Sequence, residues 1–278
     1  MNPNYVLSAG VRQVRRIHKR SAAAPAVACG MRGSWTTGPG MTVVAGSFGD
    51  IEVHHHPAVQ LAVGIDGPLA VVAGDGAEER CCIAAVASGT RHAMRPDGAS
   101  AALSIYLSPE TDTATTLNAA IQTHGGSPGL WAINGAEPLT SAVAAAVRAE
   151  DLSGAAGMVV DALLARAGVT AGAVHPQVRQ AIELVTARIP SRTDLGSVAG
   201  EVAVSADYLG RLFRKQTGTS FAATARWTRL LAALEHLSAG TSITDAAHRA
   251  GFADGAHATR VCRELTGIAP SDVVRALG

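Results

Sequence analysis

The sequence predicts an α+β protein: an N-terminal antiparallel β-barrel with following helices, then a C-terminal all-α domain of two helix-turn-helix subdomains joined by a linker helix. Three observations predict this fold. Short β-rich runs separated by Gly, Asp and Pro fill residues 41–110. Apolar residues at helical spacing replace them from Thr111 onward. One helix-turn-helix pattern then occurs twice between Asp194 and Pro270.

The C-terminal repeat is visible in the strings RLFRKQTG (211–218) and RVCRELTG (260–267). Each string ends the second helix of a unit at a glycine, which suits the left-handed residue that follows a helix. Asp194 and Ser242 stand where the first helix of each unit needs an N-cap. Each unit therefore has the form of the helix-turn-helix, whose second helix enters the major groove of DNA.

The segment between the two units, residues 221–237, has apolar or small residues at helical spacing. A helix of about 17 residues is about 25 Å long. Such a rod would hold the two recognition helices near successive major grooves, about 34 Å apart on one face of a duplex. A single chain would then span two groove segments.

From about Val178 to its end, the chain matches a known family in both residue type and spacing. The residues that carry the match are Leu209, Arg211, Phe213, Gly218, Arg229, Ala233, Leu237, Ile243, Ala247, Gly251, Phe252, Arg260, Gly267 and Pro270. They resemble the DNA-binding domain of the arabinose-regulator (AraC/XylS) family of bacterial transcription factors. The chain departs from the family where Ala258 and Cys262 replace large aromatic residues and Ala256 replaces a small hydroxyl residue. The resemblance implies double-stranded DNA as a partner, RNA polymerase as a further one, and activation or repression of transcription.

The expected DNA contacts follow from the outward faces of the two recognition helices. On residues 206–217, the buried stripe of Leu209, Leu212 and Phe213 leaves the opposite face outward. We expect base-edge contacts from Ala206, Asp207, Gly210 and Arg211, phosphate contacts from Arg214 or Lys215, and contacts from Gly255, His257, Thr259 and Arg260 on the second helix. An alternative for Arg211 is a salt bridge to an acid such as Glu201. Arg226 and Arg229 lie on the linker helix. For one of them, a structural role that holds the two subdomains together is the alternative to a DNA contact.

The charge distribution agrees with this division. The net charge of +1 is the sum of +5 in residues 1–20, −7 in residues 21–175 and +3 in residues 176–278. A basic C-terminal part suits phosphate, and an acidic middle part avoids it. A merely solvated surface is the alternative interpretation of an excess as small as +3.

Residues 1–40 are expected to be an irregular basic segment, with VRQVRRIHKR either a flexible tail or a short basic helix. No apolar region follows that would make a secretory signal, and no run approaches the ~20 apolar residues that span a bilayer. The four cysteines (Cys29, Cys81, Cys82 and Cys262) show no zinc spacing and are interpreted as reduced thiols. These observations favour a cytoplasmic protein without membrane partners. Inert burial is favoured for Cys81 and Cys82 over redox or soft-metal sensing.

Within the predicted barrel, polar residues recur at a known spacing. Gly49, His54, His56, Gln60 and Gly67, followed by Gly89 and His92, resemble the two motifs of a cupin barrel. Glutamine stands where a glutamate is usual, and Ala87 where a proline is usual. Regulators of the arabinose family often carry such a barrel as their effector domain. The resemblance therefore implies a small-molecule effector bound by His54, His56, Gln60 and His92.

Alternation along a strand places His54 and His56 on one face, which His92 could join from a later strand, while His55 faces away. Three imidazoles suit a divalent transition metal. The favoured interpretation is that these polar residues are either hydrogen-bonded relics of a shared ancestry or contacts to an organic effector, so no cofactor and no catalytic residue is expected. A metal-dependent cupin enzyme or a metal sensor using these histidines is the alternative function.

Residues 111–172 are expected to form a helical region with apolar stripes on LTSAVAAAVRA and GMVVDALLARA. These stripes either pack on the barrel or make a homodimer contact, as such helices often do in the resembled family. Residues 168–175 read as a linker, and residues 173–278 as the DNA-binding domain.

Overall fold

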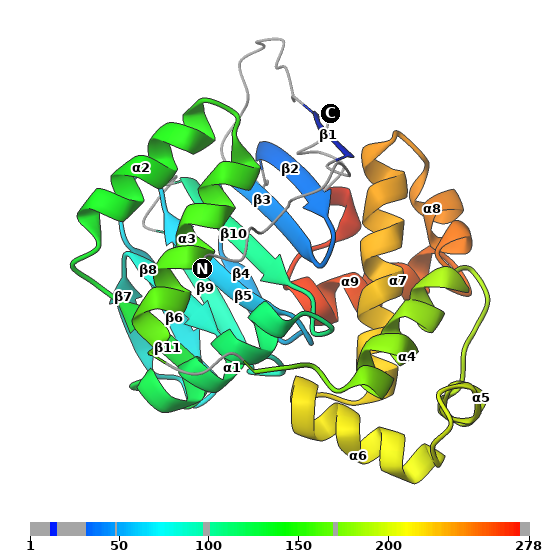
Figure 1. The fold of residues 1–278 in the computed structure, drawn as a ribbon. Helices are drawn as coiled ribbons and strands as arrows, with labels where there is room; N and C mark the ends of the chain where they lie inside the picture. The colour runs from blue at the N-terminus through cyan, green and yellow to red at the C-terminus, as the bar shows by residue number, and fades with distance from the viewer. Residues whose placement is uncertain (1–11, 16–31, 48, 97–100, 169–171, 273–278) are drawn as a thin grey trace.

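The computed structural model describes residues 12–15, 32–47, 49–96, 101–168 and 172–272. Its N-terminal part is built on two antiparallel sheets, and its C-terminal part is helical (Figure 1). The α+β class expected from the sequence is confirmed. No helix in the described ranges is both long and apolar enough to cross a membrane.

The larger sheet has seven strands. In spatial order they are β1 (Arg12–Arg15), β2 (Arg32–Gly38), β3 (Met41–Ser47), β10 (Ala101–Leu107), β5 (Val59–Gly64), β8 (Ile83–Val86) and β11 (Leu130–Ile133). The smaller sheet consists of β4 (Ile51–His54), β9 (His92–Pro96), β6 (Leu69–Ala73) and β7 (Glu78–Cys81), again in spatial order. Strands β5 and β8 are buried along their whole length, and their residues are apolar or small except for Gln60 on β5.

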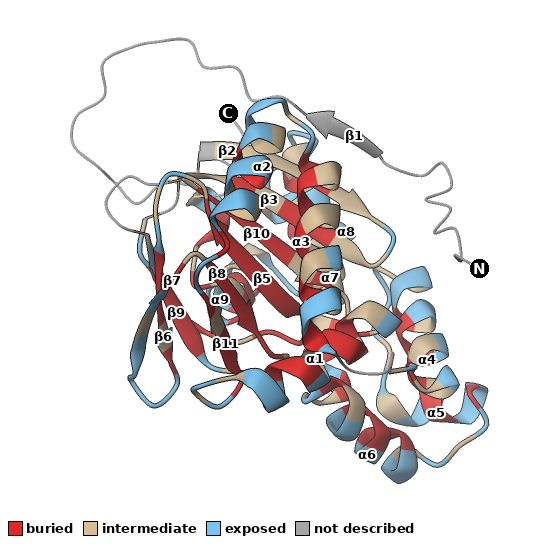
Figure 2. Cartoon of the chain, turned by 60° about the vertical axis from the view of Figure 1, so that its left-hand side comes forward, coloured by how far each residue is buried: buried red, intermediate tan, exposed pale blue. Residues whose placement is uncertain are grey.

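Three helices come after β10, with β11 between the first two: α1 (Asp112–His124), α2 (Glu137–Arg148) and α3 (Leu152–Ala167). Their apolar side chains share one hydrophobic core with the larger sheet, in which Leu117, Val143 and Leu163 are buried. The buried faces of α1 and α3 turn toward the sheet, and the outer surface of α2 is largely exposed (Figure 2). Within the chain, the apolar stripes therefore pack on the barrel.

Two expected boundaries are wrong. Residues 1–40 are not wholly irregular, because Arg12–Arg15 and Arg32–Gly38 are strands, and Arg12–Arg15 is not a helix. Residues 39 and 40 form a turn, and the other residues of that segment lie outside the described ranges. The sheet also extends beyond residues 41–110, since Leu130–Ile133 pairs with Ile83–Val86. In both cases the added strand supplies backbone hydrogen-bond partners to what would otherwise be a sheet edge.

The C-terminal domain contains α4 (Pro176–Ala187), α5 (Leu195–Glu201), α6 (Ala206–Thr217), α7 (Phe221–Ser238), α8 (Ile243–Arg249) and α9 (Gly255–Thr266). Helices α5 and α6 form the first helix-turn-helix, α8 and α9 form the second, and α7 joins them (Figure 1). Each unit has its own core, centred on Phe213 in the first and Leu265 in the second.

The local signals that predict these helices have the expected structural roles. The Asp194 carboxylate accepts a hydrogen bond from the Ser197 amide at the start of α5, and the Ser242 hydroxyl accepts one from the Asp245 amide at the start of α8. Gly218 and Gly267 end the two recognition helices in the left-handed conformation, with φ of 66° and 71°.

Candidate functional sites

The barrel brings together the four polar residues singled out in the sequence. His54 ends β4 and pairs across the strands with His92 on β9, while Gln60 lies on β5. The four residues His54, His56, Gln60 and His92 are all buried. The largest exposed fraction among them is 2%, for His54. The ring centroids of His54 and His92 are 4.2 Å apart, and that of His56 lies 5.5 Å from His54 and 5.3 Å from His92. The side chains meet as expected, but not by alternation along one strand, because His56 lies in the loop after β4 and Gln60 lies on β5 in the other sheet.

Each imidazole in this histidine cluster is oriented by a backbone carbonyl. The Nδ1 atoms of His54, His56 and His92 lie 2.8, 3.0 and 2.9 Å from the carbonyl oxygens of Glu52, Ala58 and Thr90. A carbonyl only accepts hydrogen bonds, so each Nδ1 carries the proton and donates it. In a neutral ring, each Nε2 then presents a lone pair to the centre of the cluster.

Burial keeps the three rings neutral. Desolvation and the neighbouring histidines lower the pKa of His54 to about 3 and that of His92 well below its ordinary value. Desolvation, partly offset by hydrogen bonds to Gln60 and Ala58, lowers the pKa of His56 to about 4. At neutral pH the cluster therefore holds no proton beyond the three on the Nδ1 atoms.

Gln60 lies where these lone pairs meet. Its Oε1 is 3.0 Å from His56 Nε2 and 2.9 Å from His92 Nε2, and its Nε2 is 3.4 Å from the Tyr106 hydroxyl. Three acceptors cannot satisfy one another. Either the amide turns over, so that its NH₂ group donates to both rings, or a cation occupies the centre. His54 Nε2 is buried and has no hydrogen-bond partner.

Helix α7 of the C-terminal domain closes the site. The ring of Trp227 lies 5.3 Å from that of His56 and 5.7 Å from that of Tyr106. Trp227 is only 3% exposed and shares a hydrophobic core with the barrel residue Ala58 and with Leu230. The histidine cluster is therefore in direct contact with the domain that carries the helix-turn-helix units.

Both recognition helices end against the barrel. A Cβ atom added to Gly218, after α6, would lie 2.9 Å from the Ser88 carbonyl oxygen. One added to Gly267, after α9, would lie 2.6 Å from the Glu52 carbonyl oxygen. The Ser88 hydroxyl also bonds to the Thr217 carbonyl. These close approaches need glycine for space as well as for its positive φ.

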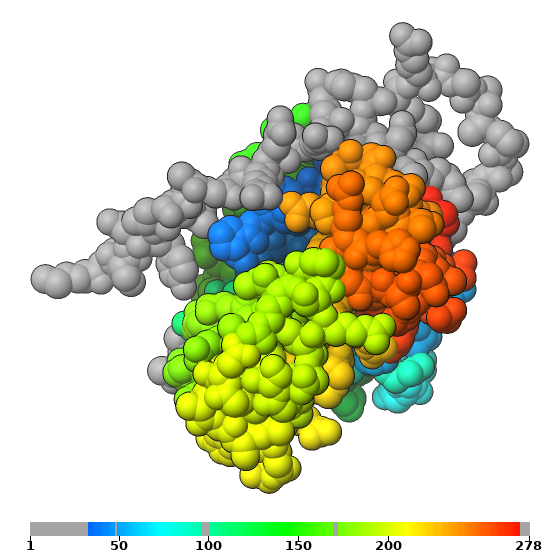
Figure 3. All heavy atoms as spheres, turned by 90° about the vertical axis from the view of Figure 1, so that its right-hand side faces the viewer, coloured from blue at the N-terminus to red at the C-terminus, as the bar shows by residue number. Residues whose placement is uncertain are grey.

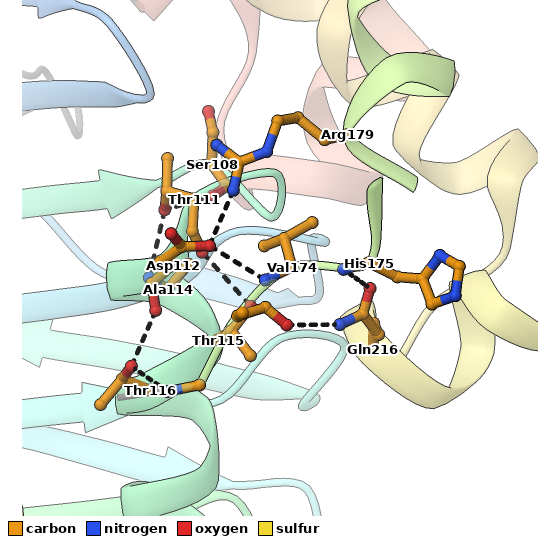
Figure 4. Close-up of polar contacts among 12 residues, drawn as sticks. Ser108, Thr111, Asp112, Ala114, Thr115, Thr116, Val174, His175, Arg179 and Gln216 are labelled. Carbon is orange, nitrogen blue, oxygen red and sulfur yellow. Dashed lines mark hydrogen bonds and ion pairs between the residues drawn. The ribbon is translucent and has the colours of Figure 1, made fainter. Parts of the chain in front are cut away.

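The linker is fixed to both domains by hydrogen bonds (Figure 4). The Asp112 carboxylate on α1 accepts from the Val174 amide at 2.9 Å and from the Arg179 guanidinium at 2.7 Å. The Gln216 side chain on α6 accepts from the His175 amide at 2.6 Å and donates to the Ala173 carbonyl at 3.1 Å. The chain between the domains therefore connects the barrel helices to the first recognition helix.

On α6, Asp207, Arg211, Arg214 and Lys215 are exposed, and Ala206 is half-buried. The expectation that Gly210 faces outward is wrong. Gly210 is buried, and Leu195 of α5 lies 3.5 Å from the position of its missing Cβ. Which residues of α6 are buried depends on how α5 crosses it. The apolar periodicity of α6 alone does not predict that crossing.

Arginine pairing differs from the expected alternative. Arg211 forms an ion pair with Asp207, one turn earlier on the same exposed face, and Glu201 pairs with Arg188 instead. Such an exposed pair contributes little stability and its members can exchange partners. Arg226 joins α7 to α9 through Glu264 at 2.8 Å, which is a structural link of the kind expected for the linker helix.

On α9, Arg260 is exposed, whereas Gly255, His257 and Thr259 are half-buried. The His257 ring packs edge-on against Phe252, with centroids 5.4 Å apart. Ala258 and Cys262, which replace larger residues of the resembled family, are buried in the core of this unit. Burial raises the pKa of the Cys262 thiol, and of the Cys81 thiol, to about 11. Both are therefore protonated and unreactive.

Comparison with known proteins identifies the C-terminal domain and the overall fold. Residues 198–276 match a family model described as a helix-turn-helix domain. No curated protein matches the chain.

Solved structures of ToxT from Vibrio cholerae match nearly the whole fold. A ligand-free variant has 12% identity and a TM-score of 0.62, covering 86% of this chain and 98% of that one. Wild-type ToxT with a bound unsaturated fatty acid has 12% identity and a TM-score of 0.56, covering 84% and 94%. A regulator with an AraC-type DNA-binding domain from Chromobacterium violaceum has 29% identity and a TM-score of 0.35, covering 36% and 93%. The chain therefore has a fold similar to that of ToxT and carries a helix-turn-helix domain over residues 198–276.

Proposed function

We propose that this protein is a sequence-specific DNA-binding transcription regulator whose affinity for DNA depends on an effector bound at the histidine cluster. The observation that carries the proposal is the position of α7. This helix joins the two helix-turn-helix units and, through Trp227, packs on the cluster. The AraC-type family match supports the DNA-binding part.

The proposed DNA contacts come mainly from α6. Asp207 and Arg211 lie on its exposed face toward its N-terminal half, the part of a recognition helix that reaches base edges. In the complex, Arg211 would leave Asp207 for a guanine, and Arg214 and Lys215 would contact phosphates. On α9, the exposed Arg260 is the strongest candidate, with Gly255, His257 and Thr259 beside it.

The effector would act through the contacts between the domains. A ligand shifts an equilibrium only by its different affinities for the two arrangements. Occupation of the cluster changes the surface on which Trp227 packs, and with it the seating of Gly218 and Gly267 on the barrel loops. The solved ToxT structure holds an unsaturated fatty acid. Here three histidines, a glutamine and a tyrosine favour a small polar effector instead.

A divalent transition metal is a second candidate for that effector. One nitrogen from each histidine lies within 4.8 Å of the others, and the Nε2 of His54 is buried without a partner. Each imidazole donates its Nδ1 proton to a backbone carbonyl. Histidines that bind a metal through the other ring nitrogen usually make the same hydrogen bond. Gln60 Oε1 would supply a fourth, oxygen ligand. When bound, the ion would remove the repulsion among the facing lone pairs.

A sensor agrees with this geometry better than a metal enzyme does. A catalytic metal needs an open position and a path for substrate. Trp227 and Tyr106 pack directly against His56 and cover this side of the cluster. Dimerisation and contact with RNA polymerase remain expectations of the family resemblance.

The DNA-binding proposal predicts a loss of discrimination on replacing Arg211. Binding of the full-length protein to duplexes selected from a random pool should exceed its binding to scrambled duplexes. Arg211→Ala should reduce that ratio by roughly 5- to 150-fold, because one bidentate arginine contact to guanine contributes about 1–3 kcal/mol. Fluorescence anisotropy measures both affinities. Arg166→Ala, on the exposed surface of α3, is the control for loss of one charge. Equal affinity of the wild type for selected and scrambled duplexes would contradict the proposal.

The metal candidate predicts binding that depends on His54 but not on its neighbour. Zinc or manganese in excess should raise the unfolding temperature of the wild-type protein, with about one ion retained per chain after desalting. At 100 times the dissociation constant, the stabilisation is about 2.7 kcal/mol. His54→Ala should abolish both effects. His55→Ala should leave them unchanged, since His55 is outside the cluster. Equal retention by the two variants would rule out this site.

The neutral histidines predict a pH dependence of stability in the metal-free protein. The folded-state pKa of His54 and of His56 lies below the ordinary value, so the unfolded state binds protons first as the pH falls below about 6.5. Stability should therefore be fully present above pH 6.5 and decrease toward pH 5, by about 1.4 kcal/mol per pH unit for each histidine well below 6.5. Urea unfolding measures this slope. His54→Ala should have a shallower slope than His55→Ala, and identical slopes would show that His54 is not held neutral.

A further inference from the structure

An open cavity of about 520 Å³ lies between the first helix-turn-helix and the linker helix. Its walls come from the N-terminal end of α5, the middle of α6 and the first half of α7. The charged residues at its surface are Asp194, Arg214, Arg226 and Arg229. The two helix-turn-helix units flank α7 on the face of the molecule seen in Figure 3.

The cavity carries unbalanced positive charge. Asp194 is engaged in capping α5, and Arg226 is paired with Glu264. Within the described ranges, no ion pair involves Arg214 or Arg229. Arg192 lies close enough to Arg229 that its charge, together with burial, lowers the pKa of Arg229. Two arginines without an ion pair, beside the single carboxylate of Asp194, leave an excess of positive charge at the cavity that favours a bound anion.

Two buried polar atoms at the cavity also have no partner. The Nε of Arg229 and the hydroxyl of Thr193 are buried and make no hydrogen bond. The only hydrogen bond recorded for the Arg229 guanidinium in the described chain is a long one of 3.5 Å, from Nη2 to the Ser191 carbonyl. Unsatisfied buried donors are costly, so their coincidence with excess charge indicates a site for an acceptor with several oxygens.

The position of the cavity relative to α6 suggests which anion it binds. Gly210 and Arg214 line the cavity, and they lie one turn apart on a helix whose adjoining face presents Asp207 and Arg211. The cavity therefore opens beside the proposed base-contacting face. On the other side of the cavity, Arg226 forms an ion pair with Glu264 of α9. A duplex read by α6 and α9 would carry its sugar-phosphate backbone past this point.

We propose that the cavity formed by Thr193, Arg214 and Arg229 binds a phosphate of the DNA backbone between the two recognition helices. The proposal rests on the proposed DNA-binding function and adds a contact that the sequence did not indicate for Arg229. Such a contact positions the duplex and adds affinity without selecting a base sequence. The burial of Gly210 fits this role, since a residue without a side chain leaves the cavity open.

The test measures how DNA affinity depends on salt in the full-length protein. Each phosphate contact adds about 0.9 to the steepness of log affinity against log salt concentration. Arg214→Gln and Arg229→Gln should each reduce that steepness by about 1, equally for selected and scrambled duplexes. Arg229→Lys, which keeps the charge, should retain most of the steepness. Arg166→Gln, on α3 and remote from the cavity, should leave it unchanged.

The outcomes separate this proposal from the function on which it rests. If the wild type binds duplexes and Arg214→Gln keeps the wild-type steepness, the phosphate site is overturned while DNA binding stands. Because Arg214 is exposed, its replacement decides the matter even if Arg229→Gln lowers the unfolding temperature. If inorganic phosphate binds the wild type but not Arg214→Gln, with no change in DNA binding, the cavity serves a free anion and the proposal fails. A wild type that binds no duplex overturns the proposed function itself.

Discussion

The packing of Trp227 against the barrel is the interaction on which the arrangement of this molecule depends. Helix α7 contributes to the cores of both helix-turn-helix units, and Trp227 extends the second core to Ala58 and Tyr106 of the barrel. The two domains each have a core of their own. The buried ring of Trp227, packed against His56, joins them. The histidine cluster is consequently connected to the recognition helices through Trp227 and α7, in addition to the direct contacts that Gly218 and Gly267 make with the barrel.

Much of the C-terminal domain could be predicted because its signals are local. The caps Asp194 and Ser242, the glycines after each recognition helix and the periodic apolar residues all act within a few positions along the chain. The meeting of the barrel histidines could be predicted only in part. His54 and His92 face each other across paired strands, whereas His56 reaches them from the loop after β4 rather than by alternation. The extension of the larger sheet by Leu130–Ile133 could not, because pairing with Ile83–Val86 joins residues far apart in sequence.

The parts of the sites that depend on contacts between separate elements could not be predicted from the sequence. The burial of Gly210 depends on Leu195 of a neighbouring helix. The direction of each imidazole depends on a carbonyl two residues away, which lies on β4 for His54 and in loops for His56 and His92. The cover provided by Trp227 depends on how two domains meet. A tryptophan in an apolar helical stripe indicates only burial, and its partner becomes known from the tertiary structure.

We propose that occupation of the histidine cluster changes DNA affinity through the contact between His56 and Trp227. A double-mutant cycle on the full-length protein, with His56→Ala, Trp227→Leu and the double variant, tests it when the free energy of DNA binding is the quantity measured. Residues that act through a shared contact show coupling of about 0.5 kcal/mol or more. This account predicts coupling of that size in DNA affinity. Strictly additive effects, or single variants that bind DNA as the wild type does, would contradict it.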